Sequence, residues 1–78
     1  MASLVHFKKV SEDSMSIRYA FGEDPDAMTR HLTMNAATRT SRPDDGGSTD
    51  YLFLKASRKI NALRDERGHW PERGMSAS

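Results

Sequence analysis

Two short runs near the N-terminus, in which apolar and polar residues alternate, constrain the fold more than any other feature of the chain. LVHFKKV covers residues 4–10, MSIRYAF covers residues 15–21, and the polar residues SEDS separate them. Successive side chains of a strand point to opposite faces of a sheet, so this alternation predicts strands with one buried face. Two such strands joined by a short polar turn predict a β-hairpin.

A third strand and a helix are predicted further along the chain. TRHLTMNA, residues 29–36, alternates in the same way, and residues 38–47 have the composition of a loop. From about Thr49 to Arg67 the apolar residues recur at helical spacing, which predicts an amphipathic helix. Gly68 follows directly and is predicted to end the helix as a left-handed cap.

The predicted order β-β-β-α indicates an α+β fold, a three-stranded antiparallel sheet packed on one C-terminal helix. We predict one domain over residues 1–71 and a flexible C-terminal tail over residues 72–78. The second face of the sheet is predicted to be open to solvent, which antiparallel sheets tolerate. The predicted core takes the inward residues of the strands and one stripe of the helix: Val5, Phe7, Ile17, Tyr19, Phe21, Leu32, Met34, Phe53, Ala56, Ile60 and Leu63.

Size and composition limit what can stabilise this domain. A domain of 78 residues has a thin stability margin, and natural domains of this size often add a disulfide, a metal or a second subunit. The chain has no cysteine, which excludes disulfides and thiolate metal sites. Self-association is therefore the supplement that we expect.

Neither the net charge nor the hydropathy of the chain indicates a strongly charged partner or a membrane location. Twelve basic and eleven acidic residues nearly cancel, so net charge does not demand a strongly charged partner. No run of about 18 apolar residues and no secretory signal are present, so we expect a cytoplasmic protein that does not enter a membrane.

The chain carries no motif for catalysis or for a cofactor. No nucleophile is placed beside a base, and most acids lie in predicted turns or at the helix ends. The three histidines, His6, His31 and His69, lack metal-ligand spacing. We therefore expect no enzymatic activity, no cofactor and no metal.

Three apolar side chains are candidates for contact with a partner. Trp70, the only tryptophan, lies between His69 and Pro71 just beyond the helix. It either folds back as a clasp over a small core or is offered to a partner as an aromatic anchor. Tyr51 and Leu54 lie away from the buried stripe of the helix. The leading hypothesis is a small protein-interaction or regulatory module that binds a protein partner, or a second copy of itself, through Trp70, Tyr51 and Leu54.

The alternative hypothesis is a nucleic-acid-binding module. Lys55, Arg58 and Lys59 fall along one flank of the predicted helix, and Lys8 and Arg18 can lie on the outer face of the sheet or its edges. KASRK, residues 55–59, resembles the basic helix start of double-stranded-RNA-binding domains, which also place three strands before a helix. The chain departs from that family because it lacks its first helix. The family's basic motif also opens the helix, whereas these residues begin a turn and a half in.

Overall fold

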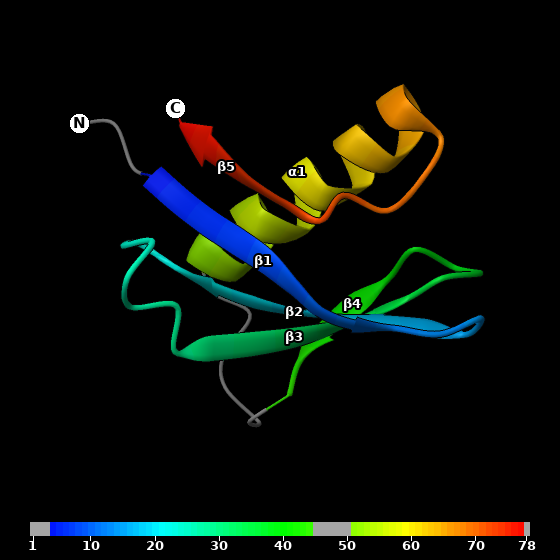
Figure 1. The fold of residues 1–78 in the computed structure, drawn as a ribbon, viewed down its shortest axis with the longest axis horizontal. Coiled ribbons are helices and arrows are strands. Elements are labelled where there is room, and N and C mark those ends of the chain that lie inside the picture. Colours follow the sequence, from blue (N-terminus) through cyan, green and yellow to red (C-terminus); the bar gives the residue numbers. More distant parts are fainter. Residues whose placement is uncertain (1–3, 45–50, 78) are drawn as a thin grey trace.

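A five-stranded antiparallel sheet with one helix across one face forms the part of the chain that the computed structural model describes, residues 4–44 and 51–77 (Figure 1). The sheet order is β4-β3-β2-β1-β5. The elements in chain order are β1 (Leu4–Glu12), β2 (Ser16–Gly22), β3 (Arg30–Asn35), β4 (Ser41–Pro43), α1 (Tyr51–Arg67) and β5 (Arg73–Ala77).

The α+β class, the antiparallel sheet and the C-terminal helix are confirmed, and the predicted number of three strands is wrong. The three predicted strands are β1, β2 and β3, and every residue of the predicted core is buried. The helix ends at Arg67, and Gly68 follows with φ +79° and donates its N–H to the Arg64 carbonyl at 2.9 Å. The predicted helix start at Thr49 lies outside the described residues.

The first correction concerns residues 73–77, which were predicted to be part of a flexible tail. They form β5, which pairs antiparallel with β1, so that Lys8 lies opposite Arg73 and Phe7 opposite Gly74. A Cβ atom at Gly74 would lie 2.7 Å from Cζ of Phe7, so the glycine lets β5 pass directly over the buried ring. The strand therefore forms because it covers Phe7, although its own residues have low strand propensity.

The second correction concerns residues 41–43, which fall in the predicted loop. They form β4, a short edge strand in which Arg42 lies opposite Thr33 of β3. The turn before β4 is ordered by Asn35, whose side-chain oxygen accepts the N–H groups of Ala37 and Thr38.

The β3–β4 turn is also tied to the helix. The amide of Asn61 donates to the carbonyl oxygen of Arg39 at 3.1 Å, and the Arg39 guanidinium pairs with Asp65. Arg39 has φ +61°, a left-handed conformation that is uncommon for a residue other than glycine. Contacts with the helix therefore hold this turn in place.

Trp70 is buried, with 8% of its surface exposed, and belongs to the hydrophobic core. The Arg64 guanidinium lies 5.7 Å from the centre of its ring. Next to it, the buried hydroxyl of Tyr19 donates to the Pro71 carbonyl at 2.7 Å, and burial raises the pKa of this phenol. The segment after α1 is thus fastened to the centre of the sheet, in agreement with the clasp interpretation.

Candidate functional site

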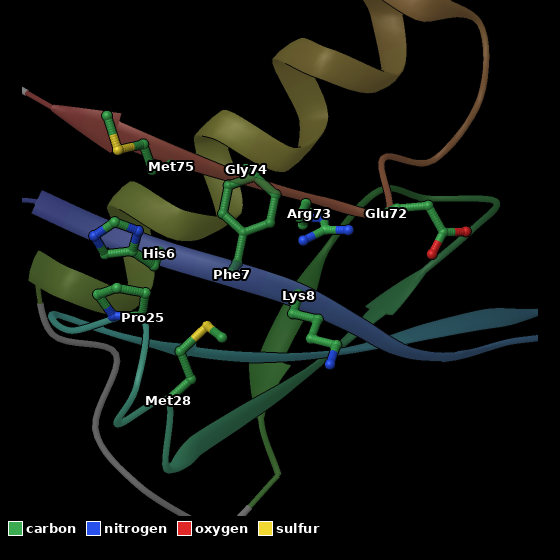
Figure 2. A pocket seen from close by; sticks show the side chains of 9 residues that line it. All are labelled: His6, Phe7, Lys8, Pro25, Met28, Glu72, Arg73, Gly74 and Met75. Atoms are coloured by element: carbon green, nitrogen blue, oxygen red, sulfur yellow. The ribbon is translucent and has the colours of Figure 1, made fainter.

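Among the hollows that the described residues form, two, one on each side of the sheet, bring together most of the candidate residues. The first, which we call the α1 groove, has a volume of about 370 Å³ and lies between the helix and β5. Its lining residues are Tyr51, Leu54, Lys55, Arg58, Lys59 and Ala62 of α1 and Ser76 of β5. The second, which we call the outer hollow, has a volume of about 560 Å³ and lies over β1 and β5 (Figure 2). Its lining includes the exposed Lys8, Pro25, Arg73 and Met75 and the half-buried His6 and Met28.

The α1 groove follows from the way in which the helix buries its apolar stripe. Phe53, Ala56, Ile60 and Leu63 face the sheet, which turns Tyr51 and Leu54 outward. These two side chains keep 60% and 41% of their surface exposed. Lone exposed apolar residues are ordinary in small proteins, but these two line one groove together with three cations.

The charge of the groove is positive. From Tyr51 to Arg64 the chain contains four basic residues and no acidic residue. Lys55 is buried and its Nζ lies 5.6 Å from the centre of the Tyr51 ring, in a cation–π contact. Within residues 4–44 and 51–77, no ion pair is found for Arg58 or Lys59. The groove therefore offers apolar surface and positive charge side by side.

The structure divides the residues that the sequence singled out into three places. Tyr51 and Leu54, predicted to bind a protein, share the α1 groove with Lys55, Arg58 and Lys59, predicted for nucleic acid. Trp70 lies in the core and not in this groove. Lys8 and Arg18 are exposed on the sheet face away from α1, so the five residues of the nucleic-acid hypothesis do not form one surface.

The sheet face away from α1 carries two cations that the sequence interpretation missed, Arg42 and Arg73. Arg42 aligns with Thr33 and, one strand further, with Arg18, while Arg73 aligns with Lys8. They were missed because their segments were predicted to be a loop and a tail. RGMSA, residues 73–77, shows no alternation of apolar and polar residues, so no local signal placed Arg73 and Met75 on this face.

Asp44 neutralises part of this face. Its carboxylate accepts hydrogen bonds from Nε of Arg18 at 2.5 Å and from the hydroxyl of Thr33. Partial burial alone would raise the pKa of Asp44, but the hydrogen bonds from Thr33 and Arg18 outweigh it and lower the pKa below its ordinary value. The carboxylate therefore holds the end of β4 against β2 and β3.

This contact should make the free energy of unfolding depend on pH in the acid range. Because the pKa of Asp44 is lower in the folded chain, its contribution is present above the unfolded pKa and disappears as the pH falls through the folded one. We expect Asp44→Asn to lower the free energy of unfolding by about 1 kcal/mol at pH 7 and by much less at pH 2. Urea titrations at both values measure this, with the exposed Asp26→Asn as control. Equal losses at both pH values would contradict the assignment.

Neither a search of the described structure for metal and membrane features nor a comparison with known proteins adds a site or a family. Among the described residues no cluster of histidine and carboxylate side chains could hold a metal ion. The helix that the structure describes is neither long nor apolar enough to cross a membrane. No protein-family model, curated protein or solved structure matches the chain.

Proposed function

We propose that the protein is a small interaction module whose α1 groove binds an acidic segment of a partner protein that also carries apolar side chains. The observation that carries this proposal is the convergence of Tyr51 and Leu54 with Arg58 and Lys59 in one groove. Burial of the two apolar side chains supplies most of the affinity, because exposed ion pairs contribute little. The cations select acidic segments and accelerate association.

The edge of the sheet suggests how such a segment is held. β5 is a terminal strand of the described sheet, so its outer edge has backbone groups without strand partners there. Ser76 of β5 lines the α1 groove, so an extended peptide in the groove lies next to this edge. Strand addition beside a helix gives affinity through main-chain hydrogen bonds and selectivity through side chains.

Selection from a library of random peptides of about twelve residues tests the proposal without a known partner. We expect the immobilised protein to enrich acidic peptides that contain aromatic or aliphatic residues. The double variant Arg58→Glu, Lys59→Glu should weaken the selected peptides at least about tenfold, as should Tyr51→Ser with Leu54→Ser.

The matched control is Lys8→Glu with Arg42→Glu, which makes the same change in net charge on the opposite sheet face. It should leave binding of the selected peptides within about twofold of the parent. Enrichment of basic peptides would contradict the proposal, and so would an equal loss of binding in the control variant.

A further inference from the structure

We infer that the outer hollow is a second, separate binding site, for a small ligand that joins a phosphate group to an aromatic ring, of which nucleoside monophosphates are the simplest class. The outer hollow lies on the sheet face away from α1, so it shares no residue with the α1 groove. The inference does not depend on the proposed peptide binding.

Two cations, Lys8 and Arg73, line one side of the outer hollow, and their placement is unfavourable as long as no anion is bound. Lys8 and Arg73 are direct cross-strand partners on neighbouring strands, and both side chains are exposed. Like charges directly opposite each other destabilise a sheet. A bound anion between them reverses the sign of this contribution.

Glu72, which directly precedes β5, and Asp44, on the same sheet face, are engaged elsewhere, whereas Glu23, Asp24 and Asp26 flank Pro25 at the other end of the hollow. Glu72 borders the outer hollow, but it pairs with Lys9 at 3.2 Å, and Lys9 also pairs with Glu12 at 2.5 Å. Asp44, the acid of the same sheet face, pairs with Arg18. Within the described residues, Lys8 and Arg73 are therefore left without an acidic partner.

A guanidinium beside an ammonium suits a phosphate better than a carboxylate. Arginine binds phosphate oxygens in a bidentate manner, while lysine adds a compact positive charge. A phosphate monoester carries about −1.5 to −2 charges at pH 7, which matches two cations.

The other end of the outer hollow is apolar. Figure 2 shows Pro25 and Met75 beside His6 at this end, with Met28 below and with Lys8 and Arg73 toward the opposite end. Met75 keeps 50% of its surface exposed. Methionine thioethers make favourable contacts with aromatic rings, and the volume of about 560 Å³ lies in the usual range for small-molecule sites. The two ends thus match the two parts of a nucleoside monophosphate.

Calorimetric and NMR titrations with adenosine 5′-monophosphate, adenosine and inorganic phosphate test the inference. We expect the monophosphate to bind at least about tenfold more tightly than either fragment. Its amide shifts should map to Lys8, Arg73 and Met28. The variant Lys8→Gln, Arg73→Gln should lose at least about tenfold in affinity. Met28→Ser with Met75→Ser should weaken the monophosphate and leave inorganic phosphate unchanged.

The matched control is Arg42→Gln with Arg58→Gln, which removes the same number of charges outside the outer hollow. Thermal melts of each variant establish that it is folded. Monophosphate binding no tighter than that of inorganic phosphate would overturn the inference, as would equal losses in the control. Tight binding of a single-stranded RNA without binding of the monophosphate would also overturn it, in favour of an extended nucleic-acid surface.

Discussion

Replacing Trp70 with alanine is expected to lower the free energy of unfolding by about 3–5 kcal/mol. The indole is buried in the core, and its loss leaves a cavity beside the residues that link α1 to β5. A chain of 78 residues has only about 4–12 kcal/mol of stability in total. The apparent melting temperature should fall by roughly 12 °C or more, as followed by circular dichroism.

Two further variants test whether the loss of stability comes from the cavity that Trp70→Ala leaves. Trp70→Phe should recover part of the lost stability, because it fills part of the cavity. His69→Ala, at an exposed neighbouring position, should change stability by less than about 0.5 kcal/mol. A stable Trp70→Ala protein that no longer bound its selected peptides would contradict the clasp and support the anchor interpretation.

Ending the chain at Glu72 is expected to lower the free energy of unfolding by at least about half. This truncation removes β5, which pairs with β1 and covers Phe7. Each lost hydrogen bond of the pairing contributes about 0.5–1.5 kcal/mol net, and uncovering an aromatic side chain adds about 1.5–3 kcal/mol. Urea denaturation and near-ultraviolet circular dichroism measure the loss.

A chain that ends at Ala77 is the control, because it keeps all of β5. A second variant, Gly74→Val, tests the same contact in the full chain. The valine collides with the Phe7 ring and should cost about 1–3 kcal/mol. If the chain that ends at Glu72 melted within about 2 °C of the parent, residues 73–77 would behave as the flexible tail that the sequence suggested.

The core and the helix could be predicted because their signals are local. Alternation at a period of two identifies the inward residues of β1, β2 and β3 without knowledge of their neighbours. The stripe from Phe53 to Leu63 and the glycine after Arg67 mark the buried face and the end of α1 in the same way. Each of these patterns is long enough to outweigh the propensities of single residues.

The two additional strands could not be predicted, because their sequences are weak and, for β5, because the partner strand is distant in the chain. β4 contains only Ser41, Arg42 and Pro43, and β5 contains glycine, serine and alanine. β4 becomes a strand through pairing with β3, which directly precedes it, and β5 through pairing with β1, at the other end of the described chain. The candidate sites share this limit, since Arg73 lies beside Lys8 only after β5 has paired with β1.

The sequence by itself determined the inward residues of β1, β2 and β3 and the buried apolar stripe of α1, because the hydrophobic effect acts on each amphipathic segment through its own periodicity. It also placed Tyr51 and Leu54 away from that stripe, where the structure finds them exposed, and Lys55 on the flank of the helix, where the structure buries it. Only the tertiary structure decided that Trp70 closes the core and that β5 covers Phe7. It alone placed the proposed contact residues on opposite faces of the sheet. Those outcomes depend on packing and strand pairing between segments far apart in the chain, such as Phe7 and Gly74, and no local pattern encodes them.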